Sequence, residues 1–174
     1  MGPKIMHPLT SIEIKGLVMY YYRFIRHWPL VATEVGVLNN YFADVIGACS
    51  TDVQEVEIKV SLSDFEHEFK SKQNKHDAYL NELINPGKKL PDPVYKLMPN
   101  KLFYAVESHL VKDVFRVVEG TPYGVMEVRK DWNNPVSVIR PAGKLHHGFP
   151  TRLWDRTVQR CSSELTSMYA AQLV

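Results

Sequence analysis

The segment VQEVEIKV at residues 53–60 constrains the fold more than any other part of the chain, because apolar and charged residues alternate along it. Alternation with a period of two is typical of a β-strand whose two faces have different surroundings. Val56, Ile58 and Val60 fall on one face, and Glu55, Glu57 and Lys59 fall on the other. The segment therefore predicts a strand with one apolar face and one charged face.

The segments before this strand predict a helix followed by two more strands. Residues 11–28 carry apolar side chains at three- and four-residue spacings, which indicates an amphipathic helix. Residues 31–50 form two β-rich runs on either side of Asn39-Asn40, a pair that tolerates the positive φ of a tight turn. A second turn at residues 50–52 leads into the alternating strand.

The segments after it predict one long helix, three strands and a closing helix. Ser63 and Glu66 have the spacing of a capping box, so we expect a helix from Ser63 to about Leu83. Residues 101–107, 123–130 and 136–140 are predicted strands, and residues 108–118 are a short helix or turn. In the final helix, residues 151–173, one stripe is expected to pack inward, namely Trp154, Val158, Cys161, Leu165 and Met168.

Length and composition indicate one globular domain spanning residues 1–174. A chain of 174 residues that is 45% hydrophobic can bury a core without disulfides. The element order favours an α/β fold with a mixed central sheet flanked by helices. The two cysteines lie far apart in sequence, and the first ten residues lack the apolar core of a signal peptide, so we expect a reduced, cytoplasmic protein. No apolar run is long enough to cross a membrane.

The net charge excludes a simple polycation that binds nucleic acid through bulk charge. The chain has 21 Lys and Arg against 19 Asp and Glu, which gives a formal charge of +2. Any nucleic-acid binding must therefore come from the local placement of charged residues.

One acid, Asp44, stands inside the almost wholly apolar run FADVIGA. A buried carboxylate needs a cation or hydrogen-bond donors, and a metal ion is one candidate. If residues 42–49 and 53–60 form a hairpin, Asp44 and Glu57 lie at similar distances from the turn and can be cross-strand neighbours. With the Ile58 carbonyl they would offer the oxygen ligands that Mg²⁺ prefers, and Lys59 would lie on the same face. The alternative is an ordinary solvated sheet face.

These residues resemble a known superfamily. The runs ADVIG, VEIKVSLSDF, KSKQNKHDAYL, KLFYAVE and YGVMEV are similar to the PD-(D/E)XK nucleases and, among them, to the MmcB-like proteins associated with DNA repair. The resemblance implies a restriction-endonuclease-like αβββαβ core, here with extra C-terminal strands and a helix. It also implies a metal-dependent DNA endonuclease that uses Mg²⁺, for which Mn²⁺ can substitute. Ala43 stands where the family name has Pro.

The resemblance also suggests roles for individual residues. Asp44 and Glu57 resemble the metal-binding carboxylates, and Lys59 resembles the lysine that orients or activates water. Glu34 is similar to an additional acid near the metal, although it could equally be a surface residue of an edge strand. Many nucleases of this size form a homodimer, but no residue marks an interface.

Two groups of basic residues are candidates for DNA contacts. Lys72, Lys75 and His76 lie on the predicted helix from Ser63 to about Leu83 and could reach a phosphate. Alternatively, Lys72 extends its stem over the sheet while Lys75 is solvated. A basic ridge on the final helix, made of Arg152, Arg156 and Arg160, could also contact phosphates, although a solvated face is the simpler explanation.

Two other functions remain open. A catalytically inactive DNA-binding or assembly module with the same fold would bind DNA in a salt-sensitive way without cleaving it. A purely structural interaction protein would bind neither DNA nor metal.

Overall fold

The computed structural model describes residues 7–85 and 90–171, which form a six-stranded mixed β-sheet flanked by helices. The strands are β1 Leu30–Gly36, β2 Phe42–Cys49, β3 Asp52–Ile58, β4 Lys101–Glu107, β5 Gly124–Val128 and β6 Val136–Arg140. They lie in sequence order across the sheet. β4 pairs in parallel with β3 and β5, and the other neighbours pair antiparallel. The predicted α/β class with a mixed sheet is therefore confirmed.

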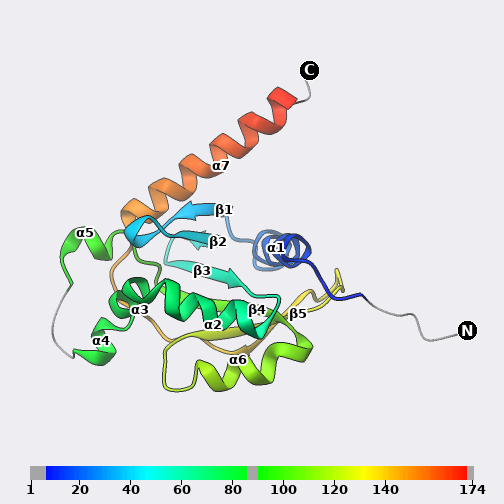
Figure 1. Cartoon of the computed structure of the whole chain (residues 1–174). Coiled ribbons are helices and arrows are strands. Elements are labelled where there is room, and N and C mark those ends of the chain that lie inside the picture. The colour runs from blue at the N-terminus through cyan, green and yellow to red at the C-terminus, as the bar shows by residue number, and fades with distance from the viewer. Residues whose placement is uncertain (1–6, 86–89, 172–174) are drawn as a thin grey trace, which may run out of the picture.

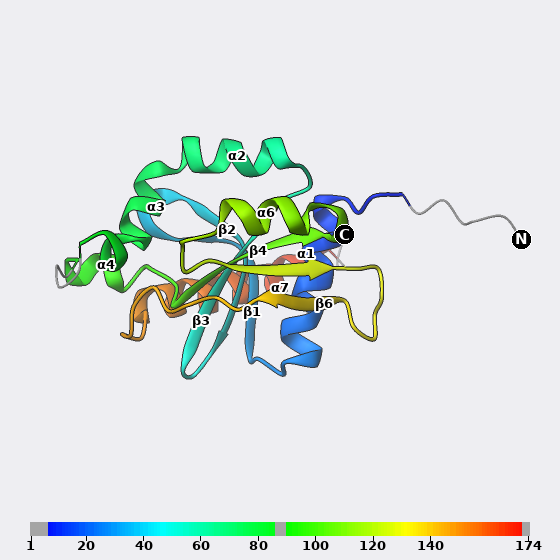
Figure 2. The same cartoon turned by 90° about the horizontal axis from the view of Figure 1, so that it is seen from below.

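The helices cover both faces of this sheet (Figure 2). They are α1 Ser11–Tyr20, α2 Leu62–Ser71, α3 Gln73–Tyr79, α4 Asn81–Ile84, α5 Asp92–Tyr95, α6 Val111–Val117 and α7 Thr151–Ala171. A π-helical turn η1, Tyr21–Ile25, follows α1, and the 3-10 turns are η2 Leu38–Asn40 and η3 Ser108–Leu110. Among these described residues, no helix is both long enough and apolar enough to cross a membrane.

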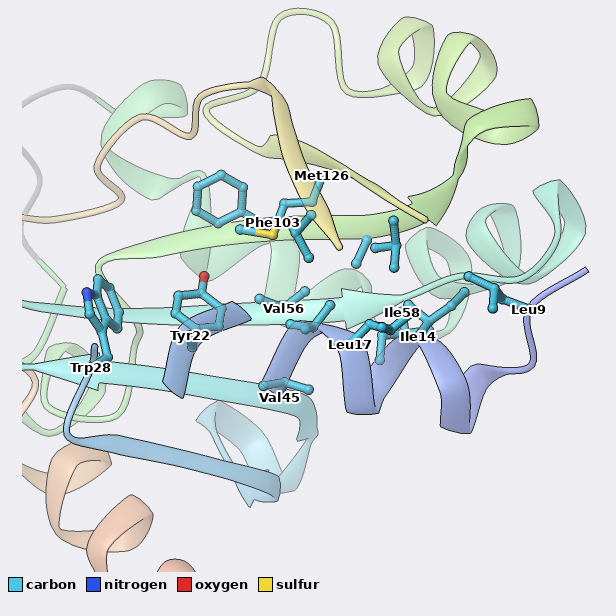
Figure 3. Packing of buried hydrophobic residues seen from close by; sticks show 14 residues of the cluster. Leu9, Ile14, Leu17, Tyr22, Trp28, Val45, Val56, Ile58, Phe103 and Met126 are labelled. Atoms are coloured by element: carbon cyan, nitrogen blue, oxygen red, sulfur yellow. The ribbon is translucent and has the colours of Figure 1, made fainter. Parts of the chain in front are cut away.

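The core on one face joins α1 to the middle of the sheet. Ile14 and Leu17 of α1 are buried against apolar residues of β3, including Val56 and Ile58 (Figure 3). The aromatic side chain of Tyr22 continues this layer and lies over Gly47, where a Cβ atom would come within 2.6 Å of the tyrosine ring. The predicted apolar face is therefore confirmed for Val56 and Ile58 and wrong for Val60, which follows the end of β3 and is 42% exposed.

The opposite face carries α2, α3 and α6. Phe65, Tyr79 and Val114 pack there against Leu102 and Tyr104 of β4. The predicted helix 63–83 is not continuous. It breaks at Lys72 (φ −112°, ψ 29°) and again at Leu80 (φ −92°, ψ 3°), and this gives α2, α3 and α4. Because the chain turns at these breaks, α3 buries polar side chains against the sheet rather than extending α2.

Helix α7 packs against β1 and then extends away from the sheet (Figure 1). The predicted inward stripe is confirmed only for Trp154 and Cys161, which pack against the core, whereas Val158 is 41%, Leu165 55% and Met168 64% exposed. The helix also buries Leu153 and Thr157, and its contacts with β1 continue to Glu164, which accepts a hydrogen bond from the Thr33 hydroxyl. Its described end is Ala171, so the predicted end at residue 173 lies outside the described residues.

Candidate functional site

Asp44 and Glu57 meet at the open end of the β2–β3 hairpin. The pairing runs from Cys49 opposite Asp52 to Val45 opposite Val56, so the next positions along the two strands are Asp44 and Glu57. The Ile58 backbone N–H donates a hydrogen bond of 2.8 Å to Asp44 Oδ2. The expected cross-strand proximity of Asp44 and Glu57 is therefore confirmed, whereas their chemical roles stay predictions.

A polar cavity of about 340 Å³ lies at this position. Asp44, Glu57, Ile58 and Lys59 all line it, together with residues from α2, and we call it the acidic cavity. The further lining residues are Ser11, Phe42, Asp64, His67, Glu68, Ser71 and Lys72. Four carboxylates and two lysine ammonium groups line it, and carboxylate oxygens are the ligands that a hard divalent cation prefers.

The Glu57 side chain is buried and surrounded by lysines. Lys75 Nζ lies 2.5 Å from Glu57 Oε1, and Lys72 Nζ lies 3.1 Å from Glu57 Oε2. Lys59 Nζ is more distant, at 3.8 Å from Oε2. Lys59 forms its closer ion pair with Glu68 of α2, which is itself buried. The charged face of β3 is thus covered by α2 and α3 and is not a solvated sheet face.

Lys75 lies beneath the cavity rather than in it. Its side chain is fully buried, and its ammonium also lies 2.5 Å from Glu55 Oε1, with the Tyr79 hydroxyl donating a 2.6 Å hydrogen bond to Glu55 Oε2. A DNA phosphate cannot reach an ammonium in this position. The predicted nucleic-acid contact by Lys75 is therefore inconsistent with its burial, and Lys75 instead holds two buried acids together.

The pKa values of Asp44 and Glu57 shift in opposite directions. Burial and the negative charge of Glu57 raise the pKa of Asp44. Burial would also raise the pKa of Glu57, but the ammonium groups of Lys75 and Lys72 outweigh it and hold that pKa below its ordinary value. For Lys59, ion pairing with Glu68 outweighs burial and raises the pKa, so its side chain is an ammonium at neutral pH. A bound cation would favour the ionised form of Asp44.

His76 is buried beside this cluster and does not face the cavity. Its ring stacks on Phe69, with the ring centroids 4.4 Å apart, and Nδ1 lies 2.9 Å from the Tyr123 hydroxyl. Burial and the neighbouring Lys75 charge lower the pKa of His76 to about 3. The predicted phosphate contact by His76 therefore conflicts with its burial and with its neutral state at physiological pH.

This lowered pKa predicts an acid sensitivity of the fold. In the unfolded chain, His76 takes up a proton as pH falls below its ordinary pKa of about 6.5, whereas in the folded chain it stays neutral until about pH 3. The free energy of unfolding therefore decreases as pH falls between these two values. Between pH 7 and pH 5, the contribution of His76 to the free energy of unfolding should decrease by about 2 kcal/mol. Urea unfolding of the wild type and His76→Gln at both pH values measures the difference. Equal pH dependence in the two proteins would contradict the prediction.

Glu34 lies on β1, where Thr33 pairs with Val45 and Val35 pairs with Ala43, so it is positioned across from Asp44. Lys15 of α1 connects the two acids, because its Nζ pairs with Glu34 and lies 3.5 Å from Asp44 Oδ1. Glu34 has a left-handed backbone with φ of 50°, which is uncommon outside glycine. It does not line the acidic cavity, so the structure brings it near Asp44 but not near Glu57.

The arginines of α7 lie outside the acidic cavity. The Arg156 guanidinium donates to the Gly36 carbonyl at 2.9 Å, and Arg160 Nε donates to the Thr33 carbonyl at 3.0 Å. Both line a second cavity of about 420 Å³ between α7 and β1, which we call the arginine cavity. Arg152 is exposed on the first turn of α7. The predicted basic ridge thus faces β1 as well as solvent.

The oxygen-bearing groups around Asp44 suit a hard divalent cation. They are two carboxylates and the nearby backbone of Ile58, and all of them line a polar cavity. The Lys72 ammonium, whose side chain is 22% exposed, now pairs with Glu57 at the cavity wall, and a metal cation could take its place there. Within residues 7–85 and 90–171, no three His, Cys, Asp or Glu side chains are grouped so as to hold a metal ion. A metal here would therefore depend on backbone oxygen and water for its remaining ligands.

Three contributors to the site were missed in the sequence. Glu68 is one helical turn before Lys72 on the polar stripe of α2, a spacing that could have marked it. Lys15 reaches Asp44 from a helix 29 positions earlier, and no local pattern indicates that contact. Phe42 precedes Asp44 by two positions and so lies on the same side of β2, which the alternation rule could have identified.

Comparisons with known proteins bear on the fold alone. No family model and no curated protein sequence matches the chain. A solved structure of a protein of unknown function from Silicibacter pomeroyi is similar to it, with a TM-score of 0.60 over 97% of this chain and 93% of that one. At 14% sequence identity, this similarity extends to the fold and not to the chemistry of the site.

Proposed function

We propose that this protein is a Mg²⁺-dependent DNA endonuclease with a restriction-endonuclease-like core, acting in DNA repair, recombination or other nucleic-acid processing. The observation that carries the proposal is the convergence of Asp44, Glu57, Ile58 and Lys59 on one cavity. The element order from α1 through β1, β2 and β3 to α2 and then β4 is consistent with the αβββαβ core that the sequence resemblance implies.

The proposed reaction is hydrolysis of a phosphodiester bond. Asp44, Glu57 and the Ile58 carbonyl would hold Mg²⁺ or Mn²⁺, which supplies positive charge and Lewis acidity at the phosphate. Water adds across the P–O3′ bond, which breaks to give a 5′-phosphate and a 3′-hydroxyl. The fold holds these oxygen atoms near one another without a cation, because the β2–β3 hairpin and the hydrogen bond from the Ile58 N–H fix Asp44 beside Glu57.

Lys59 has an electrostatic role in this proposal. Its pKa is raised by Glu68, so the side chain is an ammonium that cannot accept a proton from water at neutral pH. An ammonium on the cavity wall can donate a hydrogen bond to a lone pair of the attacking water and so orient it. It can also stabilise the negative charge that develops on the phosphoryl oxygens. Glu68 holds that ammonium from the α2 side and acts as a positioning residue.

A cleavage assay tests the proposal. Supercoiled, linear, single-stranded and branched DNA are incubated with the protein in Mg²⁺, in Mn²⁺ and in EDTA. We expect products in the two metals and none in EDTA, and the nicks should be sealed by DNA ligase without prior phosphorylation because they carry a 5′-phosphate. Salt-sensitive binding without product in either metal would instead support the inactive DNA-binding module, and the absence of both binding and product would exclude DNA as the partner.

A further inference from the structure

Phe42 is an exposed aromatic residue at the border of the two cavities. It is the first residue of β2, it is 57% exposed, and it lines both the acidic cavity and the arginine cavity. Asp44 follows two positions later on the same strand, so the two side chains point to the same side. An aromatic ring is thus held in solvent beside the proposed cleavage site, fixed to a strand of the sheet.

The arginine cavity begins on the other side of this ring. Gly36 is the cross-strand partner of Phe42, and a Cβ atom at Gly36 would lie 3.9 Å from the Phe42 ring and 3.4 Å from Arg156 Nη1. The absence of a side chain at Gly36 therefore leaves space between the ring and the guanidinium. Arg156, Arg160 and Glu34 line this cavity, and Arg160 Nε is paired with Glu164 Oε1 at 3.1 Å. The Arg156 guanidinium donates to the backbone carbonyls of Gly36 and Val37, so its positive charge is the one that can attract a phosphate beside Phe42.

The order of these groups matches the chemistry of one nucleic-acid strand. A phosphate requires positive charge, which a cation in the acidic cavity and the Arg156 guanidinium would supply on either side of Phe42. Between two phosphates lies a base with a π-face, and exposed aromatic rings next to cationic grooves are the usual platforms for such bases. A base within a duplex is stacked on its neighbours and cannot offer its face to the ring.

We propose that Phe42 stacks on an unpaired base of a DNA strand that runs from the acidic cavity to the arginine cavity. The preferred substrate class is then single-stranded DNA, or a strand that is locally unpaired at the cleavage site. This inference rests on the proposed nuclease function and narrows its substrate.

Binding to short single-stranded and blunt duplex oligonucleotides tests the stacking. Affinities are measured in Ca²⁺ and in EDTA, by fluorescence anisotropy, for the wild type, Phe42→Leu and Phe42→Tyr. Loss of the ring should weaken single-strand binding by roughly 5- to 100-fold, whereas tyrosine should preserve it. Phe24→Leu is the matched control, because Phe24 is 61% exposed and lies on η1, outside both cavity linings.

An abasic site placed at successive positions of the single strand gives a second readout. For the wild type, removing the base at one position should lower the affinity for the oligonucleotide. For Phe42→Leu, removing the base at that same position should lower the affinity no further. Equal single-strand binding by Phe42→Leu and wild type, or an equal loss on single strand and duplex, would overturn the proposal. Cleavage of single-stranded DNA by Phe42→Leu at the wild-type rate, at DNA concentrations below the dissociation constant, would overturn the stacking while leaving the nuclease function intact. If the wild type neither binds nor cleaves DNA, both the stacking by Phe42 and the proposed nuclease function are contradicted.

Discussion

Replacing Lys75 with methionine should lower the free energy of unfolding by about 3–5 kcal/mol, because it leaves the buried carboxylates of Glu55 and Glu57 without their shared ammonium. Methionine matches the length of the lysine stem, so the loss reports on charge rather than on a cavity. Lys70→Met on the exposed side of α2 is the control, and its effect should lie within about 0.5 kcal/mol of zero.

The pH dependence of this loss identifies its cause. Burial raises the pKa of Glu55 to about 7 even with Lys75 present, so in Lys75→Met the two acids can relieve their repulsion by binding protons. The destabilisation should therefore be largest above pH 7 and should shrink as pH falls. Guanidinium unfolding at pH 8 and pH 5.5 measures it. A loss below 1 kcal/mol at pH 8, or one that does not change with pH, would contradict the account of Lys75 as the counter-ion of both acids.

The sheet hairpin and its acids were predictable from sequence because they depend on local rules. The alternation in residues 53–60 and the turn at residues 50–52 fix which side chains share a face and how far each lies from the turn. These two rules are sufficient to pair Asp44 with Glu57. The positive φ expected near Asn39-Asn40 is likewise present at Asn40, with φ of 61°.

The surroundings of the acids were not predictable because they depend on contacts between distant elements. Glu57 and Lys59 alternate with apolar residues as a solvated strand would, and only the packing of α2 and α3 over β3 makes them buried. The break at Lys72 has no proline or glycine to mark it, so one continuous helix was the better interpretation of residues 63–83. That break is what places Lys75 under the sheet face instead of on the surface.

The stripe on α7 was only partly predictable, for a related reason. Helical spacing of Val158, Leu165 and Met168 shows that they share a side, but it does not show that a partner covers that side. Val158, Leu165 and Met168 are exposed, whereas Trp154 and Cys161 of the same stripe pack against the core and Leu153 and the small polar Thr157 are buried. The length of a helix relative to the sheet that supports it cannot be read from the helix alone.

Replacing Asp44 with asparagine should reduce metal-dependent DNA cleavage by at least 100- to 1,000-fold while leaving the protein folded. Asparagine has the same shape, and its carbonyl oxygen can still accept the Ile58 N–H bond, but it lacks the charge that a cation requires. Since burial raises the pKa of Asp44, removing its charge should leave the melting temperature equal to that of the wild type or higher. Lys59→Met should lose activity as well, because the cavity then lacks its buried ammonium.

The most direct test compares the rate of Mn²⁺-dependent cleavage of single-stranded DNA by the wild type, Asp44→Asn, Lys59→Met and the control Lys70→Met, all at equal folded concentration. The account predicts full activity in the wild type and in Lys70→Met, and a loss of at least 100-fold in the two cavity variants. Cleavage at the wild-type rate by Asp44→Asn or Lys59→Met would contradict the claim that the acidic cavity is the site of phosphodiester hydrolysis.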